Sequence, residues 1–174
     1  MNKEMTKGRR AALNVTQGAL IAAMYVALTL VFKPISFGEI QVRIAEALTI
    51  LPLFTPVAIP GLFIGCLIAN ITGGAIIWDV IFGSIATLIG AALGYVLRKN
   101  RWLVPIPAVV SNSIIVPLVL KYGYGIDLPL YLLVISVAAG EIVSCYVLGE
   151  LLATALLKRR FGAIVSGEDD PGTH

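Results

Sequence analysis

Long apolar runs follow one another along almost the whole chain, and they decide what it can fold into. The first, from Leu13 to Phe32, contains no charged residue. A helix needs about 20 apolar residues to cross the hydrocarbon core of a bilayer. Charged residues make up 13% of the chain, whereas soluble domains carry about 25%. The chain has too little polar surface for a soluble globule, so we expect an all-α integral membrane protein.

The apolar runs predict six transmembrane helices in a single domain, residues 1–165. The expected spans are residues 13–32, 44–54, 57–71, 76–97, 103–120 and 128–157. The second of these spans is short. Residues 166–174 (SGEDDPGTH) are polar and contain no large apolar side chain, which is typical of disorder. We therefore expect a disordered cytoplasmic tail after the sixth span.

Clusters of Lys and Arg predict the orientation, because these residues stay on the cytoplasmic side near span ends. The clusters are Lys3, Lys7, Arg9 and Arg10; Arg98, Lys99 and Arg101; and Lys158, Arg159 and Arg160. With six spans, all three fall on one face of the membrane. We expect a multi-pass protein of the cell membrane, surrounded by lipid, with both termini cytoplasmic. No basic patch interleaved with aromatic residues indicates nucleic-acid binding.

Polar side chains without a role in topology gather in the predicted outer loops or just below them. A charged residue in hydrocarbon costs about 2.5 to 3.5 kcal/mol on insertion scales, so such groups face one another or a watery cavity. We therefore predict a polar pocket that opens to the outside. Its candidate residues are Gln41, Arg43, Glu46, Asn70, Asp79, Asn112 and Glu141.

Several of these residues also have a purely structural interpretation. Arg43 and Glu46 are three residues apart, so on a helix they can pair, either to order the loop or to present the Glu46 carboxylate to a ligand. Asp79 suits a helix N-terminus, and the Asn112 amide could bond only to neighbouring helices. Glu141 lies near the middle of its span, either as a buried acid bonded to a neighbour or as a functional carboxylate.

Aromatic residues near the predicted outer face add stacking surfaces. The candidates are Phe37, Trp78, Tyr122 and Tyr124. One carboxylate can accept two adjacent N–H donors from a guanine-like edge, while an aromatic side chain stacks on the ring. A second carboxylate could hold an ammonium group. The pattern favours a flat heterocycle rich in hydrogen-bonding groups, and another polar vitamin fits the same residues.

The residue inventory argues against an enzyme. An intramembrane serine protease needs a general base, but the single histidine, His174, lies in the predicted tail. Cys66 and Cys145 stand alone in apolar runs without metal-ligand spacing, so we interpret both as small buried residues and predict no metal site. The sequence contains no Walker-type phosphate-binding motif, so this chain binds no ATP through a P-loop.

Small residues at every fourth position mark faces where helices approach closely. In the predicted third, fourth and sixth spans, packing within the bundle accounts for such stripes. In the first span the stripe consists of Ala19, Ala23 and Ala27. That stripe serves a partner only if it faces outward.

Four segments resemble the queuosine-precursor transporter (QueT) family, whose members are substrate-binding S components of energy-coupling factor (ECF) transporters. They are IQVRIAEALTILP at residues 40–52, GCLIAN at 65–70, WDVIFGSIATL at 78–88 and GEIVS at 140–144. The resemblance implies an S-component-like bundle of six helices with a short second helix. It also implies that the chain binds a deazaguanine precursor of queuosine from outside, through the seven candidate residues of the polar pocket.

The resemblance also implies partners. An S component joins a coupling transmembrane subunit that carries two ATPase subunits, so the partners would use ATP and this chain would bind no cofactor. The surface that packs on the coupling subunit maps to Ala19 and Ala23, with Ala27 as an extension. Two alternatives stay open: an S component for another vitamin, and a stand-alone proton-coupled carrier that would move its substrate without ATPase subunits.

Overall fold

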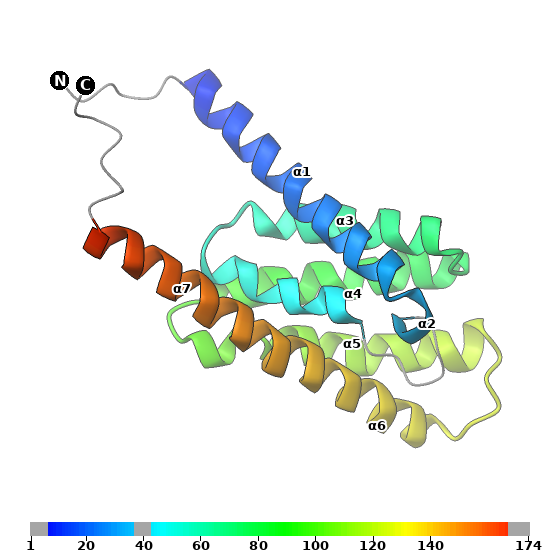
Figure 1. Cartoon of the computed structure of the whole chain (residues 1–174). Helices are drawn as coiled ribbons and strands as arrows, with labels where there is room; N and C mark the ends of the chain where they lie inside the picture. Colours follow the sequence, from blue (N-terminus) through cyan, green and yellow to red (C-terminus); the bar gives the residue numbers. More distant parts are fainter. Residues whose placement is uncertain (1–6, 37–42, 167–174) are drawn as a thin grey trace.

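The computed structural model describes residues 7–36 and 43–166, and every regular element in these ranges is a helix (Figure 1). In chain order they are α1 (Lys7–Val31), α2 (Lys33–Ser36), η1 (Ile44–Leu53), α3 (Ala58–Gly73), α4 (Ile77–Val96), η2 (Arg101–Leu103), α5 (Ile106–Leu118), η3 (Val119–Gly123), α6 (Leu130–Glu141), η4 (Ile142–Leu148) and α7 (Gly149–Ser166). The elements η1 and η2 are 3-10 helices, whereas η3 and η4 are π-helical. Together the helices form one bundle.

All six predicted apolar spans are helical, but they differ in length. Four helical segments are long and apolar enough to cross a membrane: Lys7–Val31, Ile77–Val96, Arg101–Gly123 and Leu130–Lys158. The last joins α6, η4 and most of α7 into one rod. The second and third predicted spans are the shorter helices Ile44–Leu53 and Ala58–Gly73. A short second helix was predicted, and the third is short as well. Of the predicted tail, Ser166 ends α7, and the remainder lies outside the described residues.

The 3-10 conformation of η1 lengthens a short helix. Its 10 residues include Pro52, and its first turn closes over three residues, with the Glu46 amide donating to the Arg43 carbonyl at 2.9 Å. A 3-10 helix rises about 2.0 Å per residue, against about 1.5 Å in an α-helix. The element therefore covers about 20 Å instead of about 15 Å. It contacts α1, α3, α4, η4 and α7, which places it inside the bundle.

Glycines let neighbouring helices touch at their backbones. A Cβ atom on Gly65 of α3 would lie 2.8 Å from the Cβ atom of Tyr25 in α1. A Cβ atom on Gly90 of α4 would lie 2.7 Å from the Cα atom of Ala108 in α5. Both separations are shorter than non-bonded carbon atoms tolerate. The small-residue stripes of the third and fourth spans are therefore packing faces within the bundle, as predicted.

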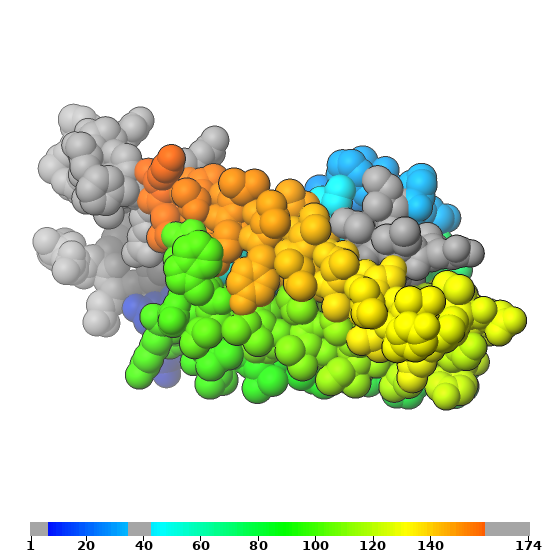
Figure 2. Space-filling model, turned by 90° about the horizontal axis from the view of Figure 1, so that it is seen from below, coloured from blue at the N-terminus to red at the C-terminus, as the bar shows by residue number. Residues whose placement is uncertain are grey.

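The bundle is apolar outside and charged inside, the reverse of a soluble domain. Its exposed large apolar side chains include Val31, Val96, Ile135 and Leu151. Figure 2 shows one face, where the rod of α6, η4 and α7 (yellow to orange) lies beside the green of α5. Charged side chains such as Glu46 and Asp79 are buried. This distribution suits a bundle that is surrounded by lipid.

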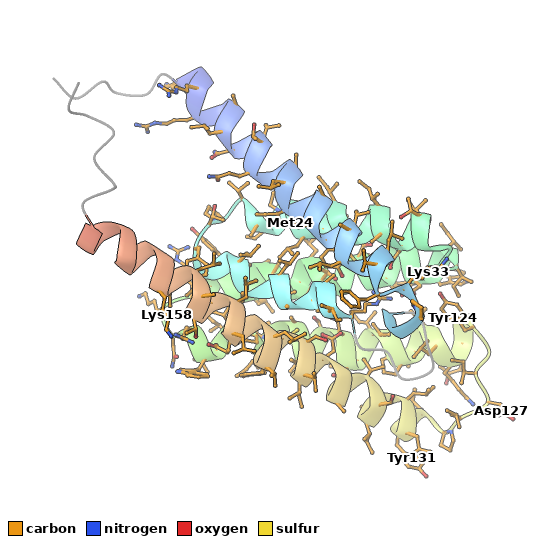
Figure 3. All side chains as sticks on the ribbon, viewed as in Figure 1. Met24, Lys33, Tyr124, Asp127, Tyr131 and Lys158 are labelled. Carbon is orange, nitrogen blue, oxygen red and sulfur yellow. The ribbon has the colours of Figure 1, made fainter. Side chains whose placement is uncertain are left out.

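The two ends of the bundle differ in charge. The start of α1, the connection between α4 and α5, and the last part of α7 lie at one end in Figure 1, and each carries residues of one basic cluster. Figure 3 places Lys158 at this end, and Lys33, Tyr124 and Asp127 at the other. We call the first the basic end and the second the opposite end. The helical connectivity thus gathers the three clusters, as the sequence predicted.

Candidate functional site

Six predicted site residues are buried together inside the bundle. Arg43 precedes η1 and Glu46 lies in it, whereas Asn70, Asp79, Asn112 and Glu141 lie in α3, α4, α5 and α6. Each is at most 5% exposed. We call these six residues the polar cluster. The other candidates at positions 37 and 41, Phe37 and Gln41, lie outside the described residues.

An ion pair between η1 and α4 forms the first part of the cluster. The Arg43 Nη2 atom donates to Asp79 Oδ2 at 3.2 Å and to Oδ1 at 3.4 Å. The Asn70 side-chain amide donates to the Asp79 backbone carbonyl at 3.3 Å. A buried carboxylate and guanidinium offset each other's desolvation only when they pair in this way. Asp79 therefore helps to hold the start of η1 against α4.

Tyr124, in the connection between η3 and α6, adds a further donor to Asp79. Its hydroxyl donates to Asp79 Oδ2 at 3.2 Å and accepts from the Ile76 backbone N–H at 3.3 Å. Partial burial and the neighbouring Asp79 carboxylate raise the pKa of Tyr124, because ionisation would place a second negative charge beside the first. The Tyr124 hydroxyl therefore stays protonated at neutral pH and acts as a donor.

The pairing of Arg43 differs from the prediction made from helical spacing. The sequence allows Arg43 to pair with Glu46, three residues later, if both lie on one helix. In the structure Arg43 has an extended backbone, with φ −87° and ψ 95°, and stands just before η1. The helical geometry that would align residues three apart therefore does not apply to it. The side chain turns to Asp79 instead, and other residues hold Glu46.

Glu46 and Glu141 form the second part of the cluster. The Tyr25 hydroxyl of α1 donates to Glu46 Oε1. The Thr87 hydroxyl of α4 lies 3.3 Å from the same oxygen and 3.2 Å from the Gly83 carbonyl oxygen of its own helix, so its one hydrogen is shared between the two acceptors. The Asn112 side chain lies close to both carboxyl groups. Among the described residues, Glu46 Oε2 is buried without a hydrogen-bond partner. Glu46 Oε1 is thus contacted by two hydroxyls, whereas Oε2 makes no hydrogen bond in the part of the chain that the structure describes.

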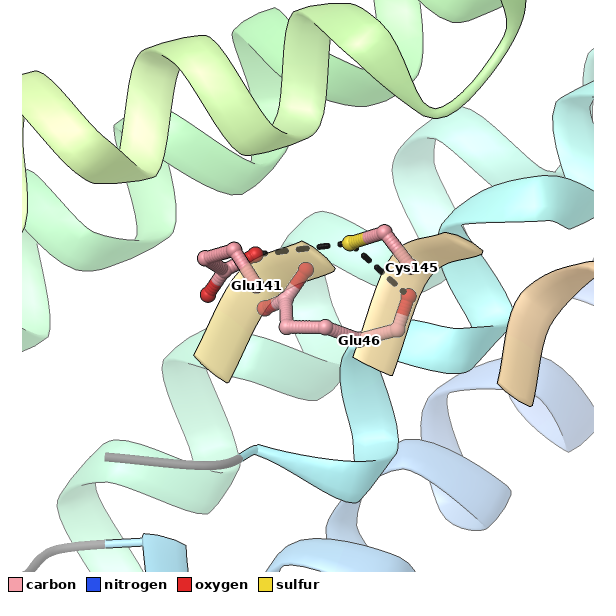
Figure 4. A group of neighbouring side chains, drawn as sticks. All are labelled: Glu46, Glu141 and Cys145. Carbon is pink, nitrogen blue, oxygen red and sulfur yellow. Dashed lines mark hydrogen bonds between the residues drawn. The ribbon is translucent and has the colours of Figure 1, made fainter. Parts of the chain in front are cut away.

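Cys145 lies beside this part of the polar cluster (Figure 4). One ligand atom from each of Glu46, Glu141 and Cys145 lies within 4.8 Å of the other two. Cys145 Sγ is 3.3 Å from Glu141 Oε2 and 3.7 Å from the Glu46 carbonyl oxygen. Two buried carboxylates at this separation repel each other strongly, so the pair favours a cationic group or a proton. Two carboxylates and a thiol are also donors that could hold a divalent metal ion. The sequence did not predict this grouping.

The comparison with known families decides the class of protein. The family model for QueT transporters matches residues 15–158. The chain belongs to the QueT transporter family. Over 82 residues it is 39% identical to the queuosine precursor transporter QueT of Lactococcus lactis subsp. cremoris (strain MG1363), a match that covers 45% of this chain and 47% of that protein. The aligned part therefore spans about half the length of that relative. No solved structure matches the chain significantly.

Membership of the QueT family agrees with the architecture. The chain is a multi-pass membrane protein, since it belongs to a transporter family and contains four helices that are long and apolar enough to cross a membrane. The matched region runs from within α1 into α7 and contains the whole polar cluster. The cluster is thus part of what the family model describes.

The alanine stripe of α1 faces outward in this QueT family member. Ala19, Ala23 and Ala27 are exposed. Together with Ile64 and Ile68 of α3 they line a shallow groove of about 480 Å³. The outward direction is the condition under which the sequence assigned this stripe to a partner.

The predicted stacking residues lie away from the polar cluster. Trp78 is 53% exposed and Tyr122 is 78% exposed. They line an apolar groove of about 720 Å³ with Phe82, whose ring stacks on Trp78 with 6.0 Å between centroids. No residue of the polar cluster lines this groove. The structure therefore places both aromatic side chains on the surface of the bundle.

Tyr25 and Thr87 are site contacts that sequence reasoning missed. A hydroxyl inside an apolar run is costly unless it is bonded, so both residues carried a weak signal. The hydroxyl of a Thr residue in a helix commonly donates a hydrogen bond to the backbone carbonyl one turn earlier. The Thr29 hydroxyl does this with the Tyr25 carbonyl at 2.9 Å. Thr87 does both, since its hydroxyl is within bonding distance of the Gly83 carbonyl and of Glu46, so the sequence alone does not identify which hydroxyls also contact the site.

Proposed function

We propose that this QueT family member is the substrate-binding S component of an ECF-type importer, which captures a queuosine precursor, a deazaguanine derivative, from outside the cell for ATP-driven uptake. The family and the transporter from Lactococcus support the substrate class. The observation that carries the proposal is the buried Glu46–Glu141 pair with the Asn112 amide beside it. These groups provide acceptors and an amide in the interior of the bundle.

In this proposal the two glutamates bind different parts of the ligand. One carboxylate accepts from the adjacent N–H donors of the guanine-like edge, which a single carboxylate can bind together. An ammonium group on the ligand's side chain binds the other carboxylate and offsets the repulsion within the pair. Asp79 was an alternative partner for the ammonium, but Arg43 and Tyr124 already engage it. The geometry therefore favours the two glutamates over Asp79.

The proposal also orients the chain and names its partners. In the cell membrane the opposite end faces outside, and both termini lie at the basic end in the cytoplasm, because Lys and Arg are retained there. The exposed stripe of Ala19, Ala23 and Ala27 packs on the coupling transmembrane subunit. Two ATPase subunits bound to that coupling subunit hydrolyse ATP, while this chain supplies recognition and carries no cofactor.

Direct binding to the purified protein tests the proposal. Aminomethyl-deazaguanine, which carries both the guanine-like edge and an ammonium group, is titrated into the detergent-solubilised chain and followed by calorimetry. Glu46→Gln and Glu141→Gln each replace a carboxylate by an amide of the same shape. A lost hydrogen bond to a charged group costs about 1.5 to 3 kcal/mol, so each variant should bind about 10- to 100-fold more weakly.

Asp127→Asn provides the matched control. Asp127 is an exposed carboxylate at the opposite end, paired with Lys121 at 3.8 Å, and its replacement should leave affinity unchanged. The assignment is wrong if both glutamine variants bind the deazaguanine as tightly as the parent. Mass spectrometry of the small molecule retained on purification distinguishes a queuosine precursor from another vitamin.

A further inference from the structure

Tyr25 is a side chain of α1 that reaches into the polar cluster. It is 1% exposed, and its hydroxyl donates to Glu46 Oε1 in η1. Its ring belongs to the same hydrophobic core cluster as Leu48 of η1 and Leu62 of α3. Tyr25 therefore joins the helix that bears the outward alanine stripe to a carboxylate assigned to ligand recognition.

Backbone contacts fix the position of α1 at this point. A Cβ atom on Gly61 of α3 would lie 2.9 Å from the Gly18 carbonyl oxygen, and one on Gly65 would lie 2.8 Å from the Tyr25 Cβ atom. Helices packed this closely do not deform independently, because interiors are close-packed. If Glu46 moves toward a ligand, either the Tyr25 hydrogen bond breaks or α1 moves together with α3.

Glu46 is arranged so that a ligand acts on this bond. Its Oε1 atom receives the hydroxyls of Tyr25 and Thr87, while its buried Oε2 has no hydrogen-bond partner within the described ranges. A donor that binds Oε2 redistributes the charge between the two carboxylate oxygens and so alters the hydrogen bonds at Oε1, because hydrogen bonds on one group polarise each other. Binding of a donor to Oε2 therefore affects the hydrogen bonds of both hydroxyls. Tyr25 lies in α1 and Thr87 lies in α4.

We infer that Tyr25 is a positioning residue that holds Glu46 for the ligand and transmits ligand occupancy to α1. This inference rests on the proposed function. Tyr25 lies two residues after Ala23 and two before Ala27, buried where they are exposed. A displacement of Tyr25 is therefore a displacement of the outward alanine stripe. The helix α1 would then carry both the Tyr25 hydroxyl, which contacts the ligand-binding carboxylate, and the alanine stripe, which contacts the partner.

The test compares Tyr25→Phe with Thr87→Val. Each removes one hydroxyl from Glu46 Oε1, but only the first acts on α1. An environment-sensitive fluorescent label on Gln17→Cys, an exposed α1 position, reports on this helix. The native thiols Cys66 and Cys145 are buried, so they stay unlabelled in the folded protein. The probe is aminomethyl-deazaguanine, added to the full chain, and affinity is measured separately by calorimetry.

We expect saturating probe to change the fluorescence of the labelled parent and of Thr87→Val, but not that of Tyr25→Phe. Both variants should bind the probe about tenfold more weakly, because each loses a hydrogen bond to a charged group. A merely structural role for Tyr25 would weaken binding and leave the fluorescence response in place. If Tyr25→Phe does not fold, Tyr25→Met replaces it in the comparison.

The outcomes separate this inference from the proposed function. A fluorescence response that persists in Tyr25→Phe overturns the inference, as does a labelled parent that binds the probe without any response. In both cases the proposed function stands, because the parent still binds the deazaguanine. A parent that does not bind the probe overturns the proposed function and the inference with it.

Discussion

At the scale of single residues, the Arg43–Asp79 ion pair contributes to stability because both of its charges are buried in the bundle. The two side chains are 5% and 1% exposed, with 3.2 Å between Nη2 and Oδ2. Removing one member of a buried pair costs about 3 to 5 kcal/mol, because the other charge stays buried. The pair joins the residue before η1 to the first turn of α4, so it also sets where η1 begins.

Asp79→Asn should therefore lower the free energy of unfolding by about 3 kcal/mol. The substitution removes the charge but keeps the size of the side chain and an oxygen that accepts from Tyr124. The midpoint of thermal unfolding of the purified protein measures the effect. Asp127→Asn is again the control, since an exposed ion pair contributes about 0 to 1 kcal/mol. An Asp79→Asn protein with the parent's midpoint would show that the pair does not hold η1 against α4.

Which residues meet in the cluster could be predicted from the sequence better than how they pair. The cost of charge in lipid indicates that these polar groups face one another, and the structure brings six of them together. Individual partners depend on tertiary placement: Arg43 and Asp79 are 36 residues apart, and Glu46 and Cys145 are 99 apart. Local spacing carries no signal for contacts at such separations.

At the scale of helices, the apolar runs predicted where each element lies but not its internal geometry. The 3-10 form of η1 and the π-helical turns of η3 and η4 are not visible in hydrophobic periodicity, because packing selects among helical forms that differ little in energy. The close approach of α4 to α5, by contrast, was indicated by the small residues of the fourth span. At Gly90 that approach is closest, with the Ala108 backbone in the way of any side chain.

Gly90→Ala should destabilise the bundle by about 1 to 3 kcal/mol, the usual cost of overpacking a core. The added methyl group would lie 2.7 Å from the Ala108 Cα atom, so α4 and α5 must separate. Gly8→Ala is the matched control: it lies in α1 with nothing within 4 Å of the added atom, and alanine is the better helix former. Recovery of monodisperse protein after heating measures both, and equal recovery would contradict the packing role of Gly90.

At the scale of the whole molecule, charged residues and small residues are distributed unevenly over the surface. The basic clusters gather at one end, which the order of the spans predicted because retention of Lys and Arg acts on the chain during insertion. The polar cluster is enclosed between helices, away from that end's exposed cations. The remaining distinctive surface is the outward stripe on α1, where small side chains leave a shallow groove beside α3.

Under the proposed function, Ala19→Leu combined with Ala23→Leu should block assembly with the coupling subunit and leave ligand binding intact. Two leucines fill the surface on which a partner helix would approach closely, at a cost of about 1 to 3 kcal/mol, so co-purification with co-expressed ATPase and coupling subunits should fall about tenfold or more. Both alanines are exposed and point away from buried Tyr25, so calorimetric affinity for aminomethyl-deazaguanine should not change.

Ala155→Leu, at an exposed alanine of α7, controls for added bulk on the lipid-facing surface. Undiminished co-purification of the double variant would remove the α1 stripe from the interface, and uptake by vesicles that contain this chain alone would favour a stand-alone carrier.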